Sequence, residues 1–162
     1  MVRKYWLAAL LVLSVLSFPA FAGESAGELV GSWKLTGWTV QVTGGDTVEP
    51  FGANPKGRIV VTRDGYWMAI LTGANRAPAK TTEEKAALLD SVLAYAGKYS
   101  VDGDRVSIKV DMSSNEIYTG ANQNQTRFFR IEGNRLTLRT AEMASAALPG
   151  KKVVVLLTCE RE

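Results

Sequence analysis

The sequence predicts an all-β, mainly antiparallel β-barrel of about eight to ten strands, with one α-helix after the fourth strand. Many short segments alternate apolar and polar residues, which is typical of strands with one face toward a core. Turn pairs such as Asp64-Gly65 and Gly133-Asn134 indicate that neighbouring segments form hairpins. Beyond the N-terminal segment, residues 82–96 alone show helical spacing. Many short strands joined mostly by hairpins favour an antiparallel barrel over a parallel sheet.

The stretch at residues 28–40 opens the predicted domain. It is interpreted as a short helical lead-in that turns at Gly31 into a long strand, with Trp33 at the start of the strand. The apolar face of this strand switches after Gly37. A β-bulge there explains the switch, because glycine adopts the backbone angles of a bulge at little steric cost. A strand this long and bent is typical of a closed barrel wall.

Further strands follow at regular spacing. They are predicted at residues 47–49, 58–62, 66–72, 98–101, 105–112, 125–132, 135–141 and 152–160. The alternation is clearest in the 105–112 segment, where period two places four apolar residues on the inner face. These are Val106, Ile108, Val110 and Met112.

The helix is predicted over residues 82–96. Thr81 and Glu84 have the spacing of a capping box, in which each side chain binds the backbone N–H of the other residue. Six residues fall on one helical face, which we expect to pack against the barrel: Leu88, Leu89, Val92, Leu93, Tyr95 and Ala96. Gly97 is expected to end the helix in a left-handed conformation.

The first 22 residues are predicted to be a signal peptide. Arg3 and Lys4 form its basic start, residues 5–18 its apolar run and Ala20-Phe21-Ala22 its cleavage site. The apolar run is shorter than the roughly 20 residues that span a membrane. Removing 22 of the 162 residues leaves 140, enough for one domain with its own core, at 23–162. We therefore expect a soluble protein that is secreted or periplasmic.

Charge and cysteine content narrow the function classes. Without Arg3 and Lys4, the mature chain has 17 basic residues against 16 acidic ones, so its composition indicates no nucleic-acid partner. The single Cys159 excludes an internal disulfide. Because Cys159 lies in an apolar segment and the chain has no histidine to act as its base, we expect it to be a small buried hydrophobic residue.

The order of motifs resembles the bacterial lipocalin-like domain family, a set of small β-barrels. The matching stretches cover nearly the whole mature chain: residues 29–35 with Trp38, 50–57, 64–68, 83–85, 93–104, 125–129 and 133–138. The Gly-x-Trp motif of Gly31 and Trp33 looks like the first lipocalin signature, which implies that both residues are structural and that Trp33 plugs the closed barrel end. We expect Arg161, at the end of the last strand, to stack on the Trp33 ring through a cation–π contact.

Two stretches depart from the family pattern. Relatives often carry a histidine in the strand that here reads Ser107-Ile108-Lys109-Val110, and an Asn-Trp-x-Gly motif where this chain has Ile117-Tyr118-Thr119-Gly120. An activity that depends on that histidine is therefore not implied here. The absence of histidine also excludes a Ser-His-Asp triad and imidazole metal ligands. We expect no catalytic residue, no bound metal and no cofactor.

The resemblance and the supply of aromatic residues together predict a ligand in the barrel, either a small hydrophobic or an amphipathic molecule. The candidate ligand-binding residues are Tyr66, Met68, Tyr95, Tyr99, Tyr118, Arg127 and Phe129. An inward-facing Arg127 requires a negatively charged partner, which can be an internal carboxylate or the anionic head of a ligand. Both alternatives stay open from the sequence.

Two other functions remain alternatives. One is a small cofactor-free enzyme of the cyclase or isomerase type that shapes a substrate in the cavity. The other is a structural module whose barrel is filled by its own side chains. A void above roughly 300 Å³ would argue against the filled barrel, since ligand sites begin near that size. The sequence leaves a monomer and a homodimer equally possible.

Overall fold

The computed structural model describes residues 24–145 and 148–162. The predicted signal peptide, residues 1–22, lies outside the described part. The helices are α1 (Glu24–Leu29), α2 (Thr82–Asp90) and the single-turn 3-10 helices η1 (Glu116–Tyr118) and η2 (Gly120–Asn122). The strands are β1 (Gly31–Val42), β2 (Thr47–Val48), β3 (Lys56–Val61), β4 (Tyr66–Thr72), β5 (Val92–Asp102), β6 (Arg105–Ser113), β7 (Asn124–Glu132), β8 (Arg135–Arg139), β9 (Met143–Ala144) and β10 (Lys152–Arg161).

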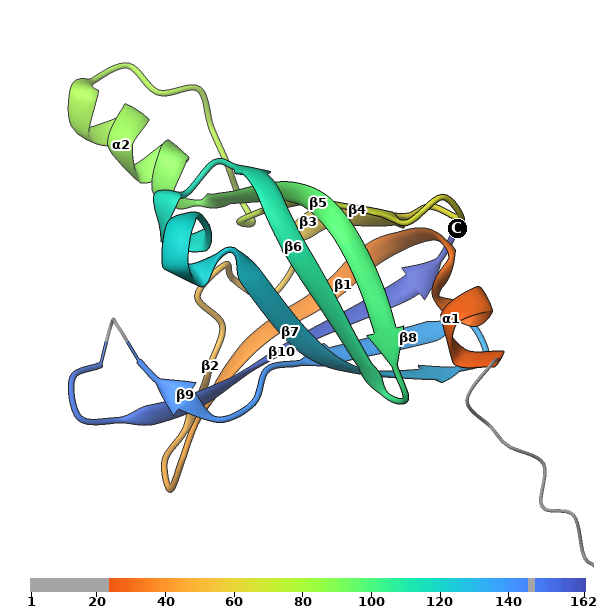
Figure 1. Ribbon diagram of the computed structural model, residues 1–162. Helices are drawn as coiled ribbons and strands as arrows, with labels where there is room; N and C mark the ends of the chain where they lie inside the picture. The colour runs from red at the N-terminus through yellow and green to blue at the C-terminus, as the bar shows by residue number, and fades with distance from the viewer. Residues whose placement is uncertain (1–23, 146–147) are drawn as a thin grey trace, which may run out of the picture.

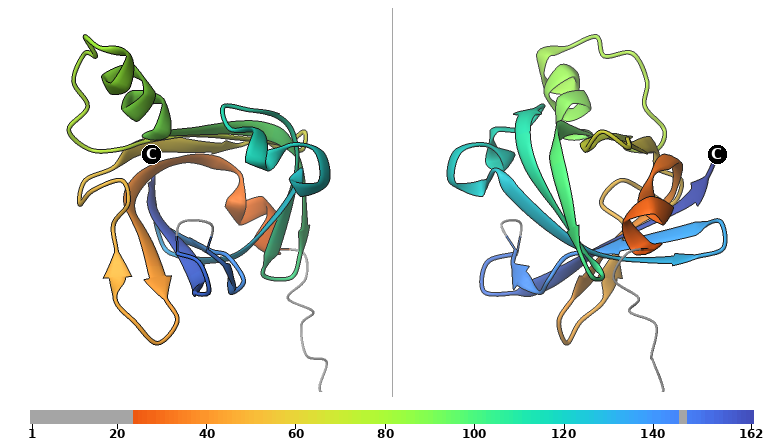
Figure 2. Two further views of the ribbon diagram at one scale, coloured as in Figure 1. Left: turned by 90° about the vertical axis from the view of Figure 1, so that its left-hand side faces the viewer. Right: turned by 45° about the vertical axis from the view of Figure 1, so that its right-hand side comes forward.

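The strands form one antiparallel sheet that closes on itself (Figures 1 and 2). The order is β2-β1-β3-β4-β5-β6-β7-β8-β10-β9, and β1 also pairs with β10. Eight strands therefore make the barrel wall, while the short β2 and β9 extend it at one end. The predicted all-β antiparallel barrel is confirmed, as is the position of α2 after the fourth strand. Closure leaves the eight wall strands without a long free edge.

Strand β1 bends as predicted. Its register against β10 shifts between Leu35 and Gly37, which is the expected bulge. A Cβ on Gly37 would lie 2.6 Å from Oγ1 of Thr158, so the close approach of β10 requires glycine here. On its other side β1 pairs first with β3 and then with β2. Strand β1 therefore keeps β10 as its neighbour on both sides of the bulge, while its other neighbour changes from β3 to β2.

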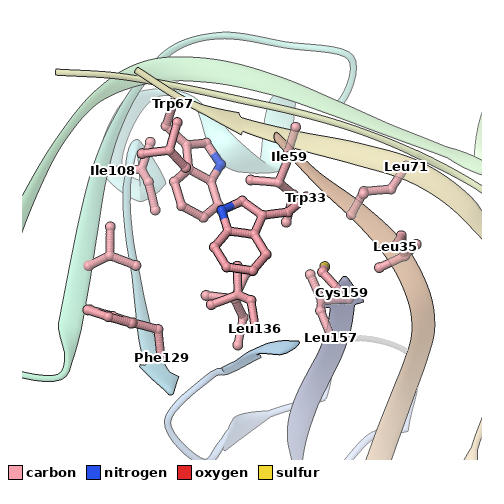
Figure 3. Packing of buried hydrophobic residues seen from close by; sticks show 14 of the residues in the cluster. Trp33, Leu35, Ile59, Trp67, Leu71, Ile108, Phe129, Leu136, Leu157 and Cys159 are labelled. Atoms are coloured by element: carbon pink, nitrogen blue, oxygen red, sulfur yellow. The ribbon is translucent and has the colours of Figure 1, made fainter. Parts of the chain in front are cut away.

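The core fills the barrel toward the α1 end. Side chains from the wall strands meet there around the indoles of Trp33 and Trp67 (Figure 3). Both indole-bearing residues are almost completely buried. Cys159 is buried in the same cluster, as predicted, and burial raises the pKa of its thiol to about 12. The thiol therefore stays protonated at neutral pH.

The predicted helix is wrong beyond Asp90. Residues 92–96 begin β5 instead, where Val92 to Ala96 pair with β4 residues from Thr72 to Met68. The same apolar residues also satisfy a period of two, and a ladder to β4 satisfies their backbone groups while burying Leu93 and Tyr95. Residues 82–90 do form the helix, with the predicted capping box of Thr81 and Glu84.

Gly97 does not end the helix, because it lies within β5 beside a bulge. A Cβ there would lie 2.0 Å from the Lys109 carbonyl oxygen. This bulge leaves Asp111 as an additional residue between the pairs Gly97–Val110 and Ala96–Met112. Met112 therefore faces outward and is exposed, which corrects its predicted inward position.

Helix α2 does not pack its apolar residues onto the barrel, contrary to the prediction. It has no buried residue, and Leu89 is 64% exposed. Figure 1 shows α2 extending away from the barrel just before the start of β5. Its C-terminus is held by Arg76, which donates to the carbonyl oxygens of Leu88 and Ser91. Four of the six residues expected on the packing face, Val92, Leu93, Tyr95 and Ala96, belong to β5 and not to the helix. The helix therefore has no continuous apolar face to pack against the barrel.

Candidate functional site

The end of the barrel beside α1 is closed by a tryptophan. The Trp33 indole Nε1 donates to the Leu29 carbonyl oxygen at 2.8 Å, so the ring is tied to α1. The Arg161 guanidinium carbon lies 4.1 Å from the centroid of the Trp33 ring, which confirms the predicted cation–π contact. Arg161 also donates to the carbonyl oxygens of Val30, at 2.9 Å, and Glu28.

Gly31 makes this arrangement possible. Its φ is +143°, in a region that residues with side chains rarely adopt. A Cβ on Gly31 would lie 2.8 Å from an Arg161 guanidinium nitrogen, so the arginine occupies the space that a side chain would need. The structural positions predicted for Gly31, Trp33 and Arg161 therefore fit one contact cluster.

A cavity of about 250 Å³ lies at the opposite end, beside η1, η2 and β9. Figure 2 (left) looks toward this end, with α1 at the back. The cavity is lined mainly by apolar and aromatic side chains from β1, β4, β5 and β10, with polar ones from β7 and the adjoining loops. The lining residues are Trp38, Leu71, Leu93, Tyr95, Tyr118, Asn122, Gln125, Arg127, Thr140, Met143, Val155 and Leu157.

The polar groups of the cavity form a short chain along β7 and η2. Arg127 donates to Oε1 of Gln125 at 3.1 Å and to the Thr126 carbonyl oxygen at 2.9 Å. Gln125 in turn donates through Nε2 to the Asn122 carbonyl oxygen. Among the described residues, no carboxylate lines the cavity and none lies within ion-pair distance of Arg127. Arg127 is thus a half-buried cation whose protein partners are neutral.

Two stacked tyrosines flank the cavity. The rings of Tyr95 and Tyr118 are nearly parallel, with centroids 5.7 Å apart. Burial raises the pKa of Tyr95, and the positive charge of Arg127 opposes part of that shift. The Tyr95 hydroxyl therefore keeps its proton at neutral pH. It can donate a hydrogen bond near the Arg127 charge.

Of the seven predicted ligand-binding residues, three line this cavity: Tyr95, Tyr118 and Arg127. Two point into the barrel outside this cavity, in or against the hydrophobic core. Phe129 is buried in the core cluster, and Tyr99 donates its hydroxyl to the Thr62 carbonyl oxygen. Their inward direction follows the predicted alternation, but their distance along the barrel removes them from the cavity lining.

The prediction that Tyr66 and Met68 surround the cavity is wrong. Both face outward on β4 and are 45% and 50% exposed. The inner face of β4 carries Trp67, Ala69 and Leu71. Apolar residues occupy both faces of this strand, so period two alone did not tell which set was inside.

The sequence-based prediction missed several lining residues. Gln125 shares the parity of Arg127 on β7 and could have been found by that signal. Trp38 lies beyond the β1 bulge, and its indole nitrogen is buried with no acceptor among the described residues. Asn122 ends the 3-10 helix η2 and Thr140 directly follows β8, so no strand pattern marks either of them.

Two further hollows lie on the outer face of the sheet. One, of about 540 Å³, includes Lys34, Lys56 and Val60 in its lining, and the other, of about 210 Å³, includes Met112. Both share Met68 and Ile70, which form the apolar surface between them. Unlike the cavity, both hollows lie on the outside of the barrel wall.

A family model described as a lipocalin-like domain matches residues 30–162, which covers β1 to β10. The chain belongs to the lipocalin-like domain family. The matched region contains both ends of the barrel, including Trp33, Arg127 and Arg161. The predicted family is therefore confirmed.

The lipocalin-like chain also matches a solved structure. It is an uncharacterized protein from Bacteroides eggerthii DSM 20697, with a TM-score of 0.43 and 12% sequence identity. The match covers 82% of this chain and 98% of that chain. The search of curated proteins found no match. In the described part of the lipocalin-like chain, no helix has both the length and the apolar character needed to cross a membrane.

Proposed function

We propose that this lipocalin-like domain binds a small apolar or amphipathic molecule in the cavity beside Tyr95 and Tyr118. The observation that carries the proposal is the division of the cavity wall. Apolar and aromatic side chains form most of it, while Asn122, Gln125 and Arg127 form one polar group. Apolar surface supplies affinity, and a few placed polar groups orient a ligand.

The size of the cavity sets the size of the proposed ligand. Its volume of about 250 Å³ lies below the roughly 300–1,000 Å³ of sites for drug-sized molecules. The volume alone therefore leaves open the alternative of a barrel filled by its own side chains. The uneven polar lining supports binding, because side chains that merely fill a core need no half-buried cation.

We further propose that the domain acts outside the inner membrane, as a secreted or periplasmic protein. The basic start, apolar run and Ala20-Phe21-Ala22 site of residues 1–22 support this. Cell fractionation and mass measurement of the mature N-terminus would check it. A mature chain that retains Arg3 and Lys4 would contradict cleavage after residue 22.

Native mass spectrometry of protein purified from its own host tests the binding proposal. We expect a retained molecule whose mass disappears on denaturation. In Leu93→Trp, a larger side chain from β5 occupies the cavity, so the retained molecule should be lost. The matched control is Ile70→Trp, which enlarges an exposed residue on the outer face of β4. Loss in Ile70→Trp with retention in Leu93→Trp would instead assign binding to the outer hollows.

A further inference from the structure

We infer that the ligand is a small carboxylic acid with an apolar body, and that Arg127 binds its carboxylate. This inference rests on the binding site proposed above and names the chemical class that the site accepts. The arginines of this chain differ in their partners. Arg58, Arg105 and Arg130 each form an ion pair with a carboxylate, and all three are exposed. Arg127 is less exposed than these three, yet it has no such partner among the described residues.

The hydrogen bonds of Arg127 leave its charge uncompensated. Its two described acceptors are the Thr126 carbonyl oxygen and the Gln125 side-chain oxygen, and both are neutral. A guanidinium has five N–H donors arranged as a fork that matches a carboxylate. Removing such a cation from water without an anion is costly. An anionic ligand would therefore gain more from this site than a neutral one of the same shape.

The lining specifies one negative charge rather than two. Among the described residues that line the cavity, Arg127 is the single cationic one. A phosphate monoester carries nearly two charges at neutral pH and would leave one of them unpaired in a mainly apolar cavity. A carboxylate carries one charge, and the protonated hydroxyl of Tyr95 supplies a further donor in the same lining. The charge balance thus favours a monocarboxylic acid.

The rest of the lining specifies the body of this acid. Trp38, Leu93 and Leu157 offer apolar surface, and Tyr118 covers Tyr95 with its ring. The volume of about 250 Å³ is too small for a drug-sized molecule. We therefore expect medium-chain fatty acids and small aryl-alkanoic acids to bind, and long-chain lipids to bind less well.

Matched ligand pairs test the inference by isothermal titration calorimetry. Phenylpropanoate is compared with phenylpropanamide, and octanoate with octanol, on the wild-type protein at neutral pH. Because hydrogen bonds to charged groups contribute about 1.5–3 kcal/mol, the acid of each pair should bind at least about tenfold more tightly. Equal affinity for acid and neutral analogue would overturn the assignment of Arg127, while binding at the site would remain supported. Absence of binding by all four compounds would contradict the proposed function as well.

Three variants test whether Arg127 causes the preference for the acid over its neutral analogue. Arg127→Met should reduce the acid-to-neutral ratio to about one while neutral ligands still bind. The control is Arg130→Met, which removes an arginine from the same strand where it faces outward and pairs with Glu132. It should keep the wild-type ratio. Arg127→Lys retains the charge but not the fork, so an intermediate ratio is expected. A ratio that falls in Arg130→Met and not in Arg127→Met would overturn the inference.

Discussion

Each end of the barrel holds an arginine that has no carboxylate partner among the described residues, but the two are stabilised in different ways. At the α1 end, Arg161 donates to two backbone carbonyl oxygens and stacks on Trp33. Its acceptors, on Val30 and Glu28, are more than 130 residues away along the chain. At the opposite end, the acceptors of Arg127 lie on the two residues that precede it.

This difference indicates separate roles for the two ends. The contacts of Arg161 join the first and last parts of the domain, so they exist only in the folded protein and favour it. Arg127 gains little from folding, since residues next to it in sequence are within reach in the unfolded chain too. Its charge instead faces a cavity with no counterion among the described residues. We therefore expect substitutions at the α1 end to change stability and those at the cavity end to change binding.

The largest expected effect is that of Trp33→Ala. It removes a fully buried indole, and large-to-small core changes of this kind cost about 3–5 kcal/mol. The measurement is the free energy of unfolding from urea titration followed by circular dichroism. An unfolding midpoint equal to that of wild type would contradict the structural role of Trp33 and the comparison of the two ends.

A smaller loss is expected for Arg161→Met. The methionine fills part of the space over Trp33 but leaves the carbonyl oxygens of Val30 and Glu28 without their charged donor. We expect a loss of about 2 kcal/mol, the scale of one or two hydrogen bonds to a charged group. The same urea titration measures it, with the exposed Arg130→Met as the control that should change stability by about 0.5 kcal/mol or less.

Gly31→Ala tests the contact between Gly31 and Arg161 at the α1 end. The new Cβ would lie 2.8 Å from the guanidinium and would need a φ of +143°. Because Arg161 is flexible and can move aside, we expect a cost of about 1–2 kcal/mol, mainly from backbone strain. In the double variant Gly31→Ala/Arg161→Met the two losses should be less than additive, because both act on one contact. Strict additivity would show that they are independent.

The smallest stability change is expected for Arg127→Met. Since no ion pair is broken among the described residues, the free energy of unfolding should fall by about 0.5 kcal/mol or less, or rise. A loss of about 3–5 kcal/mol would instead indicate that Arg127 neutralises an internal carboxylate. Thermal melts with and without octanoate separate the effects, because octanoate should raise the melting temperature of wild type more than that of Arg127→Met.

Local chemistry in the sequence determined many features of the fold. The capping box of Thr81 and Glu84 starts α2 because both partners lie within one turn. The bulge at Gly37 was predictable because the apolar residues of β1 change parity after Gly37. With β1 included, hairpin turns and alternation placed nine of the ten strands or parts of them, since each signal spans only a few residues; the two-residue β9 was not predicted. The contact of Arg161 with Trp33 was inferred from strand ends and a family motif.

Only the tertiary structure decided the features that depend on pairing between distant strands. Residues 92–96 fit both a helix and a strand, and the ladder to β4 selected the strand. Tyr66 and Met68 fit either face of β4, and closure of the barrel turned them outward. Arg127 was predicted to face inward, but whether a carboxylate reaches it depends on the loops and strands around the cavity. The cavity around Arg127 is formed by residues from β1, β5, β7, β10 and the η helices, and none of its described lining residues is a carboxylate. This arrangement exists only in the folded barrel.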